Sequence, residues 1–132
     1  MTIKEYYRHY LRKLQNIYDL DEASVIAGWV FENKASLKRS DILKDQEQEL
    51  NTDIIASLNL CLQRLLQHEP VQYVLGETWF FNMPMKVNNH VLIPRPETEE
   101  LVEWIVNYTK QHRQLEAHLS VLDIGTGSGC IA

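Results

Sequence analysis

The sequence predicts a mainly α-helical bundle over residues 1–69, then a β-hairpin linker over residues 70–95 and the start of an α/β unit over residues 96–132. Three observations support this fold class. Apolar residues recur at helical spacing in the first region. Strand-favouring Val, Tyr, Trp and Phe dominate after Pro70. An apolar run then leads into closely spaced glycines near the end of the chain. Two regions of different architecture are therefore expected.

The first helix is predicted by a capping signal. Thr2 and Glu5 have the spacing of a capping box, in which each side chain accepts a hydrogen bond from the backbone N–H of the other residue. Apolar residues follow at helical spacing and predict one buried face. They are Ile3, Tyr7, Tyr10, Leu14 and Ile17, flanked by Tyr6, Leu11 and Tyr18.

Three more helices complete the predicted bundle. Asp19 or Asp21 caps the second, and Ser40 opens a short third. Asn51 precedes the fourth, which we expect to end before Pro70. The predicted buried face of the second helix is Ala23, Ile26, Ala27, Val30 and Phe31, and that of the fourth is Ile54, Ile55, Leu58, Cys61, Leu62, Leu65 and Leu66.

A hairpin and a further helix are predicted next. Residues from Val71 to Ile93 favour strands, with Asn82-Met83-Pro84 as the turn between Thr78–Phe81 and Met85–Val87. A helix is expected from Pro96, because proline is favoured at the first helical position. Its first turn is acidic, which complements the helix dipole. Its apolar face is Leu101, Val102, Ile105 and Val106, and residues 112–116 form a polar connection.

The last segment carries a ligand-binding signal. Val121–Ile124 is predicted to be a buried parallel strand that leads into Gly125, Gly127 and Gly129. Glycines allow a tight turn and close approach of a ligand, and the N–H groups of such a turn can bind polar groups. The dinucleotide fingerprint needs Gly-x-Gly-x-x-Gly, whereas here the third glycine is at position 129. Asp123-x-Gly-x-Gly-x-Gly instead resembles motif I of class I methyltransferases. A different nucleotide site and a purely structural turn remain alternatives.

Composition excludes several classes of function. The formal net charge is −5 and no basic stripe is present, so direct binding of nucleic acid is not expected. Cys61 and Cys130 do not form a Cys-x-x-Cys pair, which indicates the cytosol as the default compartment. No apolar run approaches the length of about 20 residues that a membrane span needs. The histidines show no metal-ligand spacing with Cys or acidic residues, so no metal is expected.

The segment before the glycines carries a specific family resemblance. Gln72–Glu77, Trp79–Phe81 and the run Leu92-Ile-Pro-Arg-Pro-Glu-Thr-Glu99 resemble the release-factor glutamine methyltransferases, the PrmC/HemK family. The resemblance is close over residues 70–132. Residues 1–69 match only as a helical bundle of the right size and place. Ribosomal-protein glutamine methyltransferases are the alternative, although they tend to depart from the Pro-Glu-Thr-Glu part.

The resemblance implies a fold and a reaction. The fold is a five-helix N-terminal domain for substrate recognition, a hairpin linker and a Rossmann-like class I methyltransferase domain. The reaction is transfer of a methyl group from S-adenosylmethionine to the side-chain amide nitrogen of the glutamine in the Gly-Gly-Gln loop of a peptide chain release factor. The release factor is thus the implied partner. A non-catalytic helical module that binds a translation factor, and a nicotinamide-dependent enzyme, are alternatives from other classes.

The resemblance also implies site residues. The cofactor loop would comprise Asp123, Gly125, Thr126, Gly127, Ser128 and Gly129. Arg95, Glu97 and Thr98 would border the methyl-transfer pocket, with a helix start and a structural ion pair as the simpler interpretation. The Asn-Pro-Pro-Tyr motif that holds the amide in that family does not occur in these 132 residues. We therefore assign no catalytic residue within them and expect the natural chain to continue.

The 132-residue chain by itself is expected to have no transferase activity, because the acceptors for the amide are missing from it. Turnover by the isolated chain would contradict this expectation.

Overall fold

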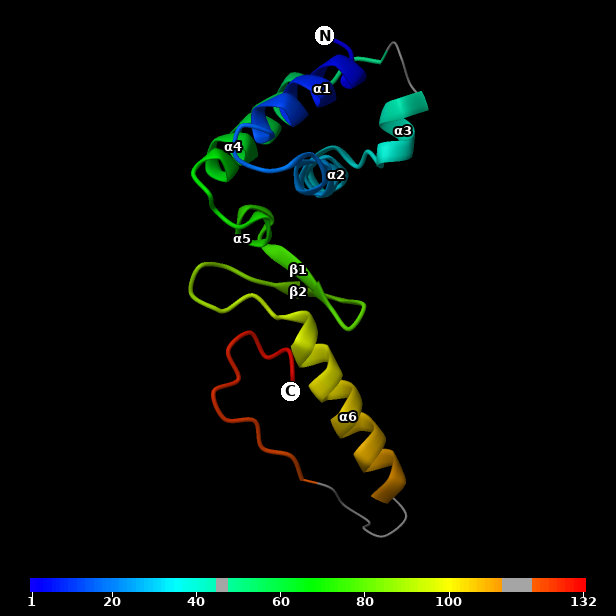
Figure 1. Cartoon of the computed structure of the whole chain (residues 1–132), viewed down its shortest axis with the longest axis vertical. Helices are drawn as coiled ribbons and strands as arrows, with labels where there is room; N and C mark the ends of the chain where they lie inside the picture. Colours follow the sequence, from blue (N-terminus) through cyan, green and yellow to red (C-terminus); the bar gives the residue numbers. More distant parts are fainter. Residues whose placement is uncertain (45–47, 113–119) are drawn as a thin grey trace. The chain divides into compact units, whose positions relative to one another are not determined.

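The computed structural model describes residues 1–44, 48–112 and 120–132. It consists of two compact units, Met1–Leu75 and Gly76–Ala132 (Figure 1). Most of the predicted polar connection at residues 112–116 lies outside the described residues.

Within its described residues, the first unit consists of five helices, drawn in blue to green in Figure 1. Helix α2 packs against α1, α4 and α5, and α1 also contacts α3 and α4. This arrangement agrees with the predicted bundle and with the implied five-helix domain. The helices are α1 (Ile3–Leu14), α2 (Leu20–Ala35), α3 (Arg39–Lys44), α4 (Thr52–Leu66) and α5 (Val71–Leu75).

The predicted helix caps are confirmed in detail. The Glu5 N–H donates to the Thr2 hydroxyl at 3.3 Å and the Thr2 N–H donates to Glu5 Oε2 at 2.9 Å, which completes the capping box. Asp19, and not Asp21, caps α2 by accepting from the Glu22 N–H at 2.8 Å. The Asn51 side chain accepts from the Asp53 N–H at 2.9 Å at the start of α4. Each bond satisfies a backbone donor that has no partner inside its helix.

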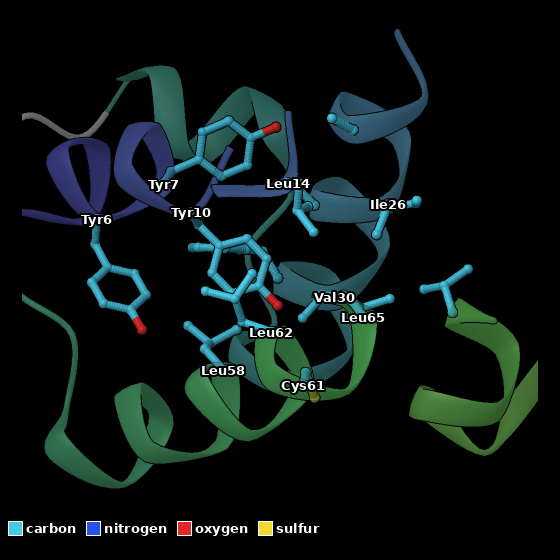
Figure 2. Close-up of a cluster of buried hydrophobic side chains, with 14 of the residues drawn as sticks. Tyr6, Tyr7, Tyr10, Leu14, Ile26, Val30, Leu58, Cys61, Leu62 and Leu65 are labelled. Carbon is cyan, nitrogen blue, oxygen red and sulfur yellow. The ribbon is translucent and has the colours of Figure 1, made fainter. Parts of the chain in front are cut away.

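Aromatic packing forms the centre of the core (Figure 2). Tyr6, Tyr7 and Tyr10 of α1 lie around Phe31 of α2, with ring centroids 6.3, 5.0 and 5.3 Å from the Phe31 ring. The Tyr7 and Tyr10 contacts are edge-to-face, a favoured geometry for aromatic pairs. Burial strongly raises the pKa of the Tyr10 phenol. Most of the remaining core residues come from the predicted apolar faces, among them Leu14, Ile26, Val30, Leu58, Cys61, Leu62 and Leu65, whereas Ile42, Val71 and Val74 belong to none of these faces.

One helix end differs from the prediction, and another agrees with it. Helix α1 ends at Leu14, so Ile17 belongs to the connection that follows it. Helix α4 ends at Leu66, and His68 takes a positive φ of 61° two residues before Pro70. The chain therefore reverses before the proline, and a residue in left-handed conformation near the C-terminal end of a helix is a common way to stop it.

Residues Val71–Leu75 form helix α5, although they were predicted to favour strands. The contacts of Arg64 explain the difference. Its guanidinium donates to both carboxylate oxygens of Glu69, at 2.7 and 2.6 Å, and to the carbonyls of Tyr73 and Val74, at 3.1 and 3.2 Å. Two carbonyls near the end of this short helix thus accept hydrogen bonds from the charged guanidinium of α4. These bonds come from another helix, so the local sequence of α5 does not predict them.

The Arg64–Glu69 pair predicts a pH dependence. The pair holds the pKa of Glu69 below its ordinary value of 4.5. A depressed folded-state pKa contributes stability that is present above pH 4.5 and is lost as the pH falls through the folded-state pKa. We expect Glu69→Gln to lower the urea midpoint at pH 7 and to lower it less at pH 3. An equal deficit at both pH values would show that the carboxylate charge is not involved.

The second unit begins with a two-stranded hairpin. Strands β1 (Glu77–Phe80) and β2 (Met83–Lys86) pair antiparallel, with Glu77 opposite Lys86 and Phe80 opposite Met83. The hairpin is confirmed, but the predicted turn at residues 82–84 is wrong. The turn is Phe81-Asn82, with φ values of 50° and 60°. Two positive φ angles are what a type I′ turn requires, and this turn matches the twist of paired strands.

Helix α6 (Pro96–His112) begins at the predicted proline. The predicted strand at Val121–Ile124 is wrong for the described residues, because this segment forms no strand and pairs with no other strand. Val121, Leu122 and Ile124 are 70%, 82% and 86% exposed. A parallel strand exists only through the backbone bonds of a neighbouring strand. The described part of this unit therefore contains the first helix of the predicted α/β arrangement but not its strand.

Candidate functional site

All three glycines of the C-terminal segment adopt positive φ. The values are 74° at Gly125, 58° at Gly127 and 77° at Gly129. A Cβ at Gly125 or Gly129 would meet no atom within 4 Å, and at Gly127 it would meet only the Gly125 carbonyl oxygen, at 3.9 Å. Backbone conformation, and not crowding, therefore requires glycine here. The open space beside these Cα atoms also lets another molecule approach the backbone closely.

The glycine loop closes on itself through one backbone hydrogen bond. The Gly129 N–H donates to the Thr126 carbonyl at 2.9 Å. The sequence indicated that N–H groups of this loop can bind polar ligand groups, but the Gly129 N–H is used within the loop. Thr126 is exposed and Ser128 is partly buried, so both lie at the surface of the loop.

Asp123 presents an orphaned acceptor just before the loop. Its Oδ2 atom is buried and has no hydrogen-bond partner within the described chain. A buried polar atom without a partner costs about 1–3 kcal/mol, and more when it carries charge. The Tyr7 and Tyr10 hydroxyls share this property in the helical core, whereas the Asp123 oxygen lies next to an exposed loop and can accept from a donor on a bound molecule. Asp123 and the glycine loop thus combine an unpaired acceptor with accessible backbone.

Arg95, Glu97 and Thr98 lie at the start of α6. The Thr98 N–H donates to the Arg95 carbonyl at 3.0 Å, which is an ordinary helix-entry contact. The Arg95 and Glu97 side chains are exposed, and Thr98 is partly buried. Across the described ranges of this unit, no hydrogen bond or ion pair joins these three residues to the glycine loop. Their observed contacts therefore correspond to a helix start.

Glu99 has a role that the sequence did not predict. Its Oε1 atom accepts from the Phe81 N–H at 2.7 Å and so connects α6 to the hairpin turn. The sequence placed Glu99 in an acidic first turn, where it complements the helix dipole. Its partner was not apparent, because the turn was predicted one residue too late.

Metal-binding clusters and membrane-spanning helices were sought over residues 1–44, 48–112 and 120–132. These ranges contain no group of three or more His, Cys, Asp or Glu side chains placed to hold a metal ion. No helix within them has the length and apolar character needed to cross a bilayer.

The order of the elements along the chain can be compared with that of known protein families. A five-helix domain is followed by a hairpin and a helix, and a glycine loop with an unpaired acidic acceptor comes after them. Residues 5–76 match the PrmC N-terminal domain family, which covers more than half of the chain. The chain belongs to the release factor glutamine methyltransferase family.

Two of three curated relatives described here carry the same family name, and the third is a bifunctional methyltransferase. A release factor glutamine methyltransferase of Flavobacterium psychrophilum is 42% identical over 132 residues, which is 100% of this chain and 46% of the relative. One from Streptococcus pneumoniae is 44% identical over 105 residues, 79% of this chain and 36% of the relative. A bifunctional methyltransferase of Rickettsia bellii is 34% identical over 113 residues, 69% of this chain and 20% of the relative. The chain thus spans less than half the length of these relatives.

Proposed function

We propose that the full-length protein transfers a methyl group from S-adenosylmethionine to the side-chain amide nitrogen of a glutamine in a peptide chain release factor. The family supports a methyltransferase with a release factor as substrate. In this chain, the proposal is supported by the glycine loop, which has positive φ at residues 125, 127 and 129. The buried Asp123 Oδ2 atom, which has no hydrogen-bond partner in the described chain, precedes the loop.

The loop residues fit S-adenosylmethionine. When bound, this cofactor supplies an activated methyl group on a sulfonium centre. Its amino and hydroxyl groups can donate hydrogen bonds to the buried Asp123 oxygen. Gly125 and Gly127 expose backbone without side chains beside them, and Thr126 and Ser128 add hydroxyl groups. We assign Asp123 and residues 125–129 to cofactor binding on this basis.

The chemistry requires precise positioning by the protein. The amide nitrogen is a poor nucleophile, because its lone pair is delocalised into the carbonyl. Alignment of the reacting groups can supply about 7–11 kcal/mol at best. Acceptors that polarise the amide as charge develops would supply more. We assign residues 1–69 to substrate recognition, residues 70–95 to the linker and residues 96–132 to the start of the catalytic domain. Arg95, at the end of the linker, and Glu97 and Thr98, at the start of the catalytic domain, are proposed to border the pocket.

The substrate is tested by counting transferred methyl groups. The full-length protein is incubated with S-adenosylmethionine labelled in the methyl group, together with its own release factor or, separately, with its ribosomal proteins. We expect label in the release factor and none in the ribosomal proteins. Label in a ribosomal protein alone would keep the reaction but overturn the substrate. No label in either sample would overturn the proposed function.

A further inference from the structure

A groove of about 420 Å³ lies on the surface of the helical unit. Helix α2 forms one wall, and the chain from His68 to Gln72, which leads from α4 into α5, forms another. All of its lining residues belong to Met1–Leu75, so the groove is a feature of this unit alone. The proposed cofactor site does not include any of these residues, and the assignment of residues 1–69 to substrate recognition does not say which surface is used.

The α2 wall of the groove is aromatic and aliphatic. Trp29 and Val25 lie one helical turn apart, and they are 48% and 50% exposed. Ile26, which is buried, lines the same wall. Large aromatic side chains that stay half-exposed beside a hollow are typical anchor points of protein interfaces, where Trp is strongly enriched.

The charge at the groove is negative. Glu22 lines it and carries an exposed carboxylate. Burial and this nearby carboxylate both raise the pKa of the Tyr18 phenol, which also lines the groove. The sequence from residue 14 to residue 33 contains no Lys or Arg, whereas it contains Asp19, Asp21, Glu22 and Glu32. The lining residues include no Lys or Arg, and Arg64 of α4, which does not line the groove, pairs with Glu69. No nearby cation on α2 therefore neutralises Glu22.

We propose that this groove binds a segment of the protein substrate in which a Lys or Arg side chain lies next to an apolar one. The cation would pair with Glu22 and stack on Trp29, and the apolar neighbour would pack on Val25. An uncompensated carboxylate disfavours nucleic-acid phosphates and anionic lipid surfaces. The inference rests on the proposed function in taking a release factor as the protein substrate.

Binding is tested with the 132-residue chain and the release factor of the same organism. The three tryptophans, Trp29, Trp79 and Trp104, give three indole N–H resonances in a ¹⁵N spectrum. We expect the Trp29 resonance to shift on titration and the Trp104 resonance to stay in place. Overlapping peptides that tile the release factor then locate the segment. The binding peptides should carry Lys or Arg beside an apolar residue.

Two variants and two matched controls test the groove. Trp29→Ala should weaken binding by at least about 30-fold, the effect of an interface hot spot. Glu22→Lys should weaken it about tenfold at low salt, and less at high salt because the charges are screened. The α2 cap uses the Glu22 backbone N–H, so this substitution keeps the cap. Trp104→Ala, at a side chain that is 66% exposed on α6, and Glu103→Lys should leave binding unchanged.

The outcomes separate this inference from the proposed function. If the release factor binds equally to the wild type, Trp29→Ala and Glu22→Lys chains, the groove is not the docking site. Acidic binding peptides, or no binding to the chain at all, would also overturn the inference. In each of these cases the methyl-counting experiment on the full-length protein still decides the proposed function independently.

Discussion

Replacing Phe31 by alanine should destabilise the helical unit by about 3–5 kcal/mol, the usual cost of removing a fully buried phenylalanine. The Phe31 ring is completely buried and contacts the rings of Tyr6, Tyr7 and Tyr10. Its removal takes away the ring that the three α1 tyrosines contact in common, and it leaves a cavity between α1 and α2. Small domains have only about 5–15 kcal/mol of stability, so the variant should unfold at much lower urea. Far-UV circular dichroism during urea titration measures the loss.

Leu60→Ala is the control for this prediction. Leu60 lies on α4 of the same unit, and its side chain points largely into solvent. Surface substitutions of this kind change stability by less than about 0.5 kcal/mol. If Phe31→Ala cost no more than Leu60→Ala, the aromatic cluster would not be the centre of the core.

Replacing Gly127 by valine should strongly weaken cofactor binding by the full-length protein. The backbone at Gly127 has φ of 58°, which a β-branched residue adopts only under strain. Left-handed conformation alone costs about 1–2 kcal/mol for a residue with a Cβ, and the valine methyl groups also occupy the space beside the loop. We expect the affinity for S-adenosylmethionine to fall by at least about tenfold, with methyl transfer falling in parallel. Isothermal titration calorimetry measures the affinity.

Gly28→Ala provides the matched glycine control. Gly28 lies inside α2, and a Cβ there would meet no atom within 4 Å. Alanine should therefore stabilise the helix by about 0.5–1 kcal/mol and leave cofactor affinity unchanged. Wild-type affinity in the Gly127→Val protein would mean that the cofactor binds elsewhere.

Local signals predicted the helical unit well. The capping box at Thr2 and the caps at Asp19 and Asn51 depend on residues two or three positions apart, which the sequence displays directly. The apolar faces follow in the same way from helical spacing. Helix α5 could not be predicted, because its carbonyls receive donors from Arg64 on another helix.

Elements that depend on distant partners were predicted less well. The turn at Phe81-Asn82 uses positive φ at two residues other than glycine, and Glu99 stabilises it from α6. The segment Val121–Ile124 has strand composition, but a strand also needs a neighbour. For the site, glycine spacing indicated the loop, because positive φ favours glycine. The buried Asp123 oxygen became apparent only from its three-dimensional surroundings.

We propose that the full-length protein methylates one glutamine side chain of a release factor. The most direct measurement is peptide mass spectrometry of the release factor after incubation with the full-length protein and S-adenosylmethionine. We predict one added methyl group on the side-chain amide of the glutamine in the Gly-Gly-Gln loop, and none when the cofactor is omitted. A methyl group on another residue, or an unmodified release factor, would contradict the claim.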